Sequence, residues 1–309
     1  MKNKRRKTII VVGYQCNNNC LFCSIGDADR KYNRSYIDIV DDIEKGYQKG
    51  CRAVEFIGGE VTMRDDIVDI VKKSKSIGYQ EISFETNGRM FSFNNFTDAI
   101  IKAGLNRVLF FIHGHNNIIH DKLTQSHGSF DQAIEGIKKV NKYPEVIVNT
   151  NFVINKLNFK NIKDYLKFIS QFNIFLSFIS FLNPIGSALK NPEIIPKMSE
   201  VVPCLTEALE NNYSFRIKIQ NIPACLMIKY NEILVKAEDK KNSYMDSETR
   251  KEVSLTKEIK SLKIKPKICS QCVLNRECDG IWKGYHDIYG HKELTAINYY
   301  GKSRYKNRV

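Results

Sequence analysis

The chain lacks any run of about eighteen apolar residues, so its sequence encodes no helix that could cross a lipid bilayer. Its first seven residues are basic, but the apolar run that follows, at residues 8–13, is too short to be the core of a secretory signal. These two absences exclude a membrane-spanning chain and argue against secretion. We therefore expect a cytoplasmic protein with no membrane partner.

Disulfide bonds are not expected, because cysteines in a cytoplasmic chain point to metal ligands or catalysis instead. The nine cysteines fall into groups: three near the start, Cys51 alone, and five from Cys204 onward. Cys51 precedes an apolar run and is interpreted as a small core residue. Cys204, at the start of a predicted helix, is interpreted as a packing residue and left out of the predicted ligand sets.

Charge is unbalanced, with 48 Lys and Arg against 34 Asp and Glu, a formal net charge of +14. Such an excess can indicate an anionic partner, for example nucleic acid, a phosphorylated metabolite or an acidic peptide. The basic residues are scattered, however, and are densest at the two ends of the chain. We therefore assign no polyanion site and do not expect a nucleic-acid partner.

Apolar runs alternate with amphipathic stretches through the first half of the chain. The predicted strands are residues 8–13, 53–57, 81–85, 107–112, 146–154 and 174–182. The predicted helices are residues 37–49, 65–77, 96–103, 130–141 and 161–171. Repeated strand–helix units predict right-handed crossovers and a parallel sheet. Six units are too few for a closed eight-fold barrel, so we predict an α/β fold with an open, partial (β/α)6 TIM-type barrel.

The alternating pattern ends at Asn183-Pro184, and more prolines follow. Beyond them we predict a helix at 200–211, a strand at 214–220 and an exposed, partly helical insert at 236–266. The remainder is rich in cysteine and aromatic residues. A chain of 309 residues can bury a large core, and we predict a barrel domain at 1–190 and a small cysteine-rich domain at 191–309.

Cys16, Cys20 and Cys23 directly follow the first predicted strand and are separated by three and two residues. This spacing can wrap a [4Fe–4S] cube while supplying three ligands for its four irons. The open iron would be a place for chemistry. A zinc knuckle, or three unrelated thiols, is the alternative, although no fourth ligand lies nearby in the sequence.

Polar motifs follow the next two predicted strands. Gly58-Gly59-Glu60 ends the second strand, where glycines let the backbone approach a ligand and Glu60 adds a carboxylate. Thr86-Asn87-Gly88 ends the third. In a barrel of parallel strands these ends share one rim, where ligands bind. Plain turns are the alternative for both motifs.

Histidines are concentrated after the fourth predicted strand, with four of the six between residues 113 and 127. They could form a metal site or a proton relay. We favour the simpler interpretation, loop histidines beside a helix start that is capped by Ser129. On the fifth strand, Asn149 and Asn151 share one face, and either could contact a ligand.

A second cysteine group lies near the end of the chain, at Cys269, Cys272 and Cys278. Upstream, Cys225 offers a fourth thiol. Four cysteines would close a cube with no open iron, suited to electron transfer or structure. Zinc on the same four ligands is the alternative.

The three-then-two spacing, with Phe22 before the third cysteine, resembles the signature of the radical S-adenosylmethionine (SAM) superfamily. The segment from Cys278 to Tyr285 resembles the shortened, twitch or SPASM-like tail that holds an auxiliary cluster. The resemblance implies that the first three cysteines hold a [4Fe–4S] cluster whose open iron chelates SAM. It further implies SAM contacts by six residues: Gly58, Gly59, Glu60, Thr86, Asn87 and Asn151.

By this resemblance the chain is an enzyme that splits SAM reductively into methionine and a 5′-deoxyadenosyl radical, which takes a hydrogen from the substrate. An electron donor such as flavodoxin or ferredoxin is implied, and so is an auxiliary [4Fe–4S] cluster on Cys225, Cys269, Cys272 and Cys278. Relatives often carry Ser-aliphatic-Asp-Gly on the fourth strand, where this chain has Phe111 and His113. This departure leaves the ribose contact of that strand unassigned.

Two substrate classes stay open, with a peptide or protein slightly ahead of a small metabolite or nucleotide. The catalytic motif begins at residue 16, so we expect no N-terminal peptide-recognition domain, which weakens the peptide reading. The rival of another class is a non-enzymatic iron–sulfur or zinc protein that binds nucleic acid through its positive charge. That rival would not need Gly58-Gly59-Glu60 at a strand end.

Overall fold

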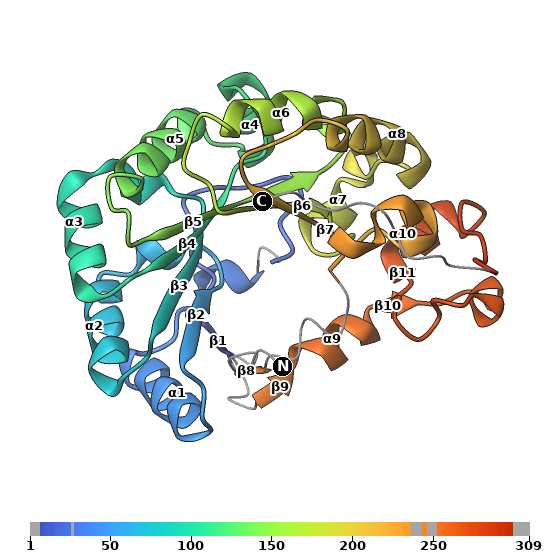
Figure 1. Ribbon diagram of the computed structural model, residues 1–309. Helices are drawn as coiled ribbons and strands as arrows, with labels where there is room; N and C mark the ends of the chain where they lie inside the picture. The colour runs from blue at the N-terminus through green and yellow to red at the C-terminus, as the bar shows by residue number, and fades with distance from the viewer. Residues whose placement is uncertain (1–6, 26–27, 236–242, 246–251, 299–309) are drawn as a thin grey trace.

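Short runs of Ile, Val and Phe form an arc of strands lined on its outside by helices, as the computed structural model in Figure 1 shows. The structure describes residues 7–25, 28–235, 243–245 and 252–298. Its sheet has nine strands in the order β7-β6-β5-β4-β3-β2-β1-β8-β9. The strands are β1 (Lys7–Val11), β2 (Ala53–Ile57), β3 (Glu81–Thr86), β4 (Arg107–Phe111), β5 (Ile147–Ile154), β6 (Leu176–Phe181), β7 (Arg216–Gln220), β8 (Ser243–Met245) and β9 (Glu252–Ser254).

Strands β1 to β7 pair in parallel with their sequence neighbours. The two ends of this sheet do not pair with each other, so the predicted open, partial barrel is confirmed. All six predicted strands are present. The strand predicted at 214–220 joins the same sheet as β7, so the sheet continues past residue 190, the predicted end of the barrel domain.

Helices follow the strands and cover the convex face of the sheet (Figure 1). They are α1 (Tyr36–Gln48), α2 (Ile67–Ile77), α3 (Asn94–Ala103), α4 (Asn117–Thr124), α5 (Ser129–Val140), α6 (Ile162–Ile169), α7 (Ser187–Lys190) and α8 (Met198–Leu209). In α1 the buried residues Ile39, Ile43 and Gly46 recur every three or four positions, as expected of a helix packed on a sheet. The short helix α4, in the histidine-rich loop, was not predicted.

Alternation along each strand separates the two faces of the sheet. Phe56, Phe84 and Phe110 are completely buried and belong to the core between strands and helices. The intervening residues face the inside of the arc, and those near the carboxyl ends of the strands include the polar Glu85, Asn151, Ser180 and Gln220. The inward-facing residues at the carboxyl ends of the strands are therefore available to form a binding site.

The C-terminal part lies at the open side of the arc (Figure 1). It comprises α9 (Leu255–Ser261), β10 (Lys263–Ile264), β11 (Ile281–Trp282) and α10 (Lys283–Tyr289). The ring of Tyr285 packs 5.6 Å from that of Phe181, and its hydroxyl accepts a hydrogen bond of 2.9 Å from the backbone N–H of Met198. These contacts fix the C-terminal part against the end of the sheet.

The insert predicted at 236–266 contains β8, β9, α9 and β10, while residues 236–242 and 246–251 lie outside the described residues. β8 pairs with β1 and extends the sheet, which the sequence did not suggest. The division into domains at 190 and 191 stays a prediction.

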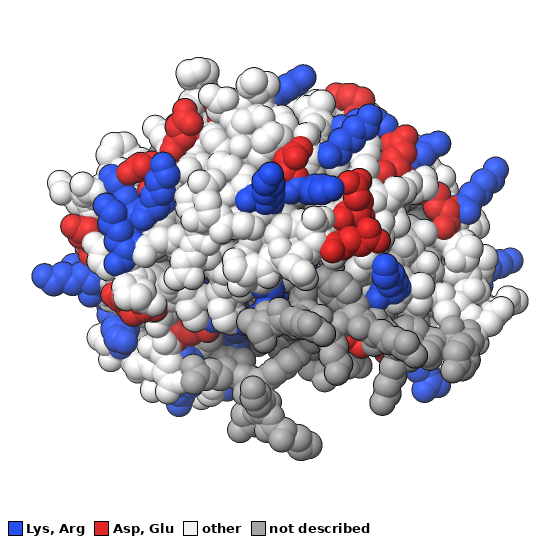
Figure 2. All heavy atoms as spheres, turned by 45° about the horizontal axis from the view of Figure 1, so that its top comes forward, with Lys and Arg blue, Asp and Glu red and all other residues white. Residues whose placement is uncertain are grey.

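Charges of both signs are interspersed on the face shown in Figure 2, with no broad area of one sign. This agrees with the scattered basic residues of the sequence and gives no support to a nucleic-acid surface on that face. Among the described residues, no helix is long and apolar enough to cross a membrane.

A buried ion pair joins the start of α1 to the end of β1. The guanidinium of Arg34 lies 2.6 Å from the carboxylate of Asp42, and both side chains are at most 1 % exposed. Arg34 also donates to the carbonyl of Val11 at 3.3 Å. Since β1 leads directly into the loop of Cys16, this pair helps to place that loop.

Replacing Asp42 by alanine should lower the free energy of unfolding by roughly 3–5 kcal/mol, because the buried guanidinium of Arg34 loses its counter-charge. The matched control is Asp41→Ala, which removes an exposed carboxylate paired with Lys45 at 2.6 Å and should cost less than about 1 kcal/mol. Urea unfolding followed by circular dichroism measures both. Equal losses would show that the buried pair does not stabilise the barrel.

Candidate active site

A cavity of about 360 Å³ lies at the carboxyl ends of the strands. It is lined by every residue predicted to hold the first cluster or SAM: Cys16, Cys20, Cys23, Gly58, Gly59, Glu60, Thr86, Asn87 and Asn151. Segments far apart in the sequence therefore meet at one site, on the rim where a parallel barrel places its ligands.

Gly58 and Gly59 press against the backbone that leads to the first cysteine. A Cβ atom on Gly58 would lie 2.1 Å from the carbonyl oxygen of Gly13, and one on Gly59 would lie 2.2 Å from that of Gln15. The N–H of Gly59 donates to Gly13 O at 2.9 Å, and that of Glu60 donates to Gln15 O at 2.7 Å. The two glycines are thus needed for the close contact between the loop after β2 and the loop after β1. The sequence motif alone did not indicate this contact.

The carboxylate of Glu60 is buried and accepts four hydrogen bonds. One oxygen accepts from the N–H of Thr62 at 3.1 Å and from the hydroxyls of Thr62 and Thr86, each at 2.6 Å. The other accepts from the N–H of Asn87 at 2.6 Å. Burial raises the pKa of Glu60 above its usual value, and these hydrogen bonds oppose the rise. Glu60 thus joins the loops after β2 and β3 at the rim.

Arg89, just after the Thr86-Asn87-Gly88 motif, holds the cysteine loop from the other side. Its guanidinium donates to the carbonyl of Asn17 at 2.6 Å and to the side chain of Asn18 at 2.9 Å. Asn87 donates from its amide to the side-chain oxygen of Asn17 at 2.7 Å. This anchoring could not be predicted from local sequence patterns, because it depends on contacts between residues about seventy positions apart.

The unpredicted helix α4 also supports the loop. The N–H of Asn19 donates to Thr124 O at 2.9 Å, and that of Leu21 donates to Leu123 O at 3.0 Å. The loop that carries the three cysteines is therefore hydrogen-bonded to the segments after β2, β3 and β4. A loop held at this many points is already shaped before any ligand binds.

The three thiols fit an iron–sulfur cluster. Burial raises the pKa of Cys16 to about 11, and burial with the charges of Cys23 and Cys16 raises that of Cys20 further. Buried thiols can bind as thiolates only if a metal offsets the cost of the buried charge. The N–H of Asn18 lies 3.4 Å from the sulfur of Cys16, where it would stabilise a bound thiolate. Three cysteines on one cavity match a cube with one open iron.

His113 lines the cavity, whereas His120 lies behind it. The two rings are stacked with centroids 5.6 Å apart, and His113 also packs edge-on against Phe22 at 4.8 Å. Burial lowers the pKa of both histidines, so both are neutral at pH 7. No group of three His, Cys, Asp or Glu in the described ranges is placed to hold a single metal ion.

The predicted cap by Ser129 is wrong. Helix α5 begins at Ser129, and the carboxylate of Asp121 accepts from its hydroxyl at 2.9 Å and from the N–H groups of Gly128 and Phe130 at 2.7 and 2.8 Å. An acceptor eight residues upstream in the preceding helix replaces the local cap, so sequence proximity alone misled the prediction.

Asn151 rather than Asn149 lies at the cavity. Both face inward from β5, but Asn151 is one step nearer the rim, lines the cavity and accepts a hydrogen bond from the Ser180 hydroxyl at 2.8 Å. The lining also includes polar residues that the sequence analysis did not assign: Arg30, Glu85, Ser180, Asn183, Gln220 and Asn221. Inward alternation on β3, β6 and β7 would have found Glu85, Ser180 and Gln220.

The four cysteines of the second predicted group line a separate pocket: Cys225, Cys269, Cys272 and Cys278. Burial raises the pKa of Cys225, and the charges of the other three thiols raise it further. The N–H of Gly280 lies 3.4 Å from the sulfur of Cys278. The ligands of a [4Fe–4S] cube bind four different irons and therefore lie farther apart than the ligands of a single metal ion. The four thiols can thus hold a cluster, although no group of three His, Cys, Asp or Glu among the described residues is placed to hold one ion.

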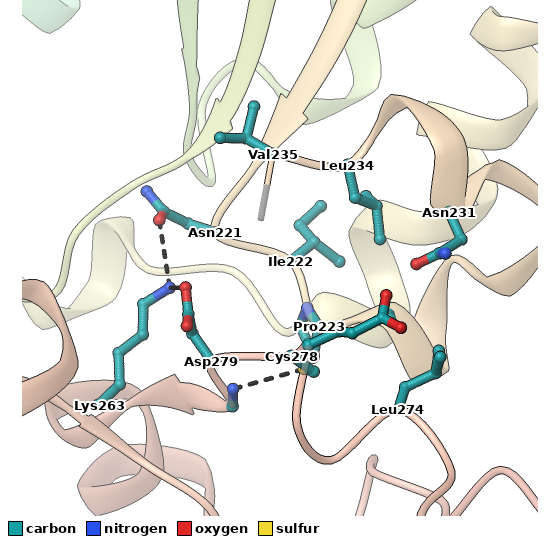
Figure 3. A pocket seen from close by; sticks show the side chains of 13 residues that line it. Asn221, Ile222, Pro223, Asn231, Leu234, Val235, Lys263, Leu274, Cys278 and Asp279 are labelled. Atoms are coloured by element: carbon teal, nitrogen blue, oxygen red, sulfur yellow. Dashed lines mark hydrogen bonds and ion pairs between the residues drawn. The ribbon is translucent and has the colours of Figure 1, made fainter. Parts of the chain in front are cut away.

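Between the two cysteine groups lies a third pocket, shown in Figure 3. Asn221 lines both this pocket and the cavity, and it adopts a positive φ of 64°. The ammonium of Lys263 reaches its side-chain oxygen at 3.5 Å and the carboxylate of Asp279 at 4.0 Å. Asp279 directly follows Cys278. A short polar chain therefore connects the neighbourhood of the second cysteine group to the wall of the cavity.

Comparisons with known proteins agree with this geometry. The family model described as the radical SAM superfamily matches residues 10–169. A protein of Sulfolobus acidocaldarius named "Probable GTP 3′,8-cyclase" is 30 % identical over 180 residues, 57 % of this chain and 56 % of that protein. The protein of the same name from Saccharolobus solfataricus is 30 % identical over 178 residues, 57 % of each chain. The match thus spans little more than half the length of these curated relatives.

Solved structures share the fold over nearly the whole chain. Streptococcus suis SuiB bound to S-adenosylmethionine has a TM-score of 0.66 at 13 % identity, covering 95 % of this chain and 76 % of that one. The structure titled native anSMEcpe with bound AdoMet and Cp18Cys peptide has a TM-score of 0.59 at 14 % identity, covering 95 % and 93 %.

The family match covers more than half of the chain, including the strands that carry the cysteine loop and the Gly58-Gly59-Glu60 turn. It agrees with the open parallel barrel and with the three thiols gathered on its rim. This protein belongs to the radical SAM superfamily of enzymes.

Proposed function

We propose that the protein cleaves SAM reductively and uses the resulting radical to modify a peptide or protein. The observation that carries this proposal is the meeting of three cysteines with Gly58-Gly59-Glu60 on one cavity. A chain that used its iron–sulfur site only for structure would need no such cavity beside it.

Cys16, Cys20 and Cys23 would hold the cluster, which together with SAM supplies a 5′-deoxyadenosyl radical when bound. The backbone of Gly58 and Gly59, with Glu60, Thr86, Asn87 and Asn151, would bind SAM. The apolar walls of the cavity, Leu109, Phe111 and Val153, would exclude water and limit where a substrate can lie. We propose a flavodoxin or ferredoxin as the electron donor.

A peptide suits the charges of the cavity better than a nucleoside triphosphate. Within the described part of the chain, Arg30 is the one Lys or Arg among the lining residues, and it already donates to the carbonyl of Asn18 at 2.7 Å. The lining also carries two carboxyl groups, Glu60 and Glu85. A triphosphate requires several cations to offset its charge.

A small metabolite or nucleotide is the second candidate, because two relatives named "Probable GTP 3′,8-cyclase" are 30 % identical over 57 % of the chain. The substrate is thus tested directly, by offering GTP and peptides to the same reconstituted enzyme.

For the C-terminal part, we propose a twitch or SPASM-like domain, at 191–309, with an auxiliary [4Fe–4S] cluster on Cys225, Cys269, Cys272 and Cys278. The shared pocket of these thiols supports the proposal. So does the fold likeness to solved radical SAM structures, which extends over 95 % of the chain and thus beyond the barrel.

Anaerobic reconstitution should give about eight irons per chain, four for each cube. Replacing Cys16, Cys20 and Cys23 together by alanine should remove about half and abolish 5′-deoxyadenosine formation from SAM with dithionite. Replacing the other four ligands should remove the other half. Cys51→Ala, a core cysteine outside both sites, is the control and should keep all the iron. About four irons with one zinc in the wild type would overturn the auxiliary cluster.

Glu60→Ala should raise the dissociation constant of SAM about tenfold to a hundredfold, because SAM would lose a charge-assisted hydrogen bond. The iron content should stay unchanged. Equilibrium dialysis with labelled SAM measures the affinity. The control is Glu81→Ala, at the opposite end of β3, where the carboxylate pairs with Arg107 at 3.2 Å. An unchanged affinity would show that Glu60 only joins the two loops.

Cys272→Ala should abolish substrate conversion while 5′-deoxyadenosine formation survives in part, if the second cluster binds substrate or passes electrons. Product is measured per folded, SAM-binding enzyme, so that a loss of stability is not counted as a loss of function. Cys204→Ala, on α8 and outside the pocket, is the control. Near wild-type turnover in Cys272→Ala would show that the second site is purely structural.

A further inference from the structure

The side chain of Glu85 lines the cavity. It lies near the end of β3, one residue before Thr86, and alternation turns its side chain to the inside of the arc, whereas Phe84 joins the outer core. Among the described residues, no donor lies within hydrogen-bonding or ion-pairing distance of its carboxyl group. A carboxyl group that lines a cavity without a hydrogen-bond partner is costly to keep charged, and such groups cluster at functional sites.

The surroundings of Glu85 disfavour a lone negative charge. Its neighbour in register on β4 is the apolar Leu109. Burial, with the negative charge of Glu55 below it on β2, raises the pKa of Glu85 well above its usual range. Lys7 opposes this from β1, but its ammonium already lies 3.3 Å from the carboxylate of Glu55. A positively charged group that entered the cavity would therefore stabilise the carboxylate form of Glu85 by pairing with it.

Other cavity groups are engaged elsewhere. The carboxylate of Glu60 holds Thr62, Thr86 and Asn87, and Arg30 donates to the backbone of Asn18. Within the described residues, Glu85 is thus the carboxyl group of the cavity that the scaffold does not use.

We propose that Glu85 binds a cationic nitrogen of the substrate, so that the enzyme prefers a peptide that presents an ammonium group to the cavity. This rests on the proposed function and adds to it the chemical class of the group that is recognised. A substrate ammonium would restore the charge pair that the fold leaves incomplete, which makes the desolvated carboxyl group a source of specificity.

Two other sources of a matching group can be distinguished by experiment. SAM itself carries an ammonium and a sulfonium, and guanine presents N–H groups that a carboxylate can accept. If SAM were the partner, replacing Glu85 would weaken SAM binding. If guanine were the partner, replacing it would weaken GTP binding and leave an ammonium peptide unaffected.

The test uses the reconstituted enzyme with saturating SAM and two probes, acetyl-Gly-Lys-Gly-amide and its norleucine isostere. Calorimetry should show the lysine probe binding at least about tenfold more tightly than the norleucine probe to the wild type. Glu85→Gln should lose that preference, whereas Glu81→Gln, on the same strand but outside the cavity, should keep it. GTP and SAM are titrated into the same three proteins.

Equal binding of the two peptide probes to the wild type would overturn the inference, and this comparison stands even if Glu85→Gln fails to fold. A loss confined to SAM or to GTP in Glu85→Gln would overturn it as well. Failure of the proposed function looks different, since the wild type would then form no 5′-deoxyadenosine from SAM and dithionite. A lysine preference that depends on Glu85 supports the inference.

Discussion

The site depends on one close contact, between the backbone of Gly58-Gly59 and the chain that leads from β1 to Cys16. There is no space there for a side chain on either glycine. Because the two backbones touch, the N–H of Glu60 reaches Gln15, and its carboxylate can then hold Asn87. The positions of the cysteine loop, the β2 loop and the β3 loop are therefore set together, and a side chain at either glycine would displace all three.

The inner face of the sheet is organised differently from that of most parallel sheets, whose strands are apolar on both faces. Here the outer face packs Phe56, Phe84 and Phe110 against helices, whereas the inner rim carries Asn151 and Ser180. The open arc makes this possible, since a closed eight-stranded barrel fills its interior with side chains. The C-terminal part lies at the open side of the arc (Figure 1).

Sequence patterns predicted the strands and the open barrel well, because these depend on local periodicity, and the rule that parallel strands end on one rim placed the predicted site residues at one cavity. They did not predict Arg89 as an anchor or Asp121 as the cap of α5, since both act on segments distant from themselves. Helix α4 was missed because it is only eight residues long, too short for a helical pattern to stand out in the sequence. Glu85 was predicted only as the last residue of the third strand, although alternation along that strand already places it on the inner face.

The position of Asn221 connects the cavity at the cysteine loop with the pocket beside Cys278. Its left-handed backbone is costly for a residue other than glycine, and its amide lies at the wall between the cavity and the pocket beside Cys278 (Figure 3). A single side chain thus takes part in both compartments, with Lys263 on one side and the carbonyl of Phe181 on the other. If a shift of this amide couples binding in the cavity to binding in the pocket beside Cys278, the coupling is reciprocal. Each ligand then changes the affinity for the other by the same factor.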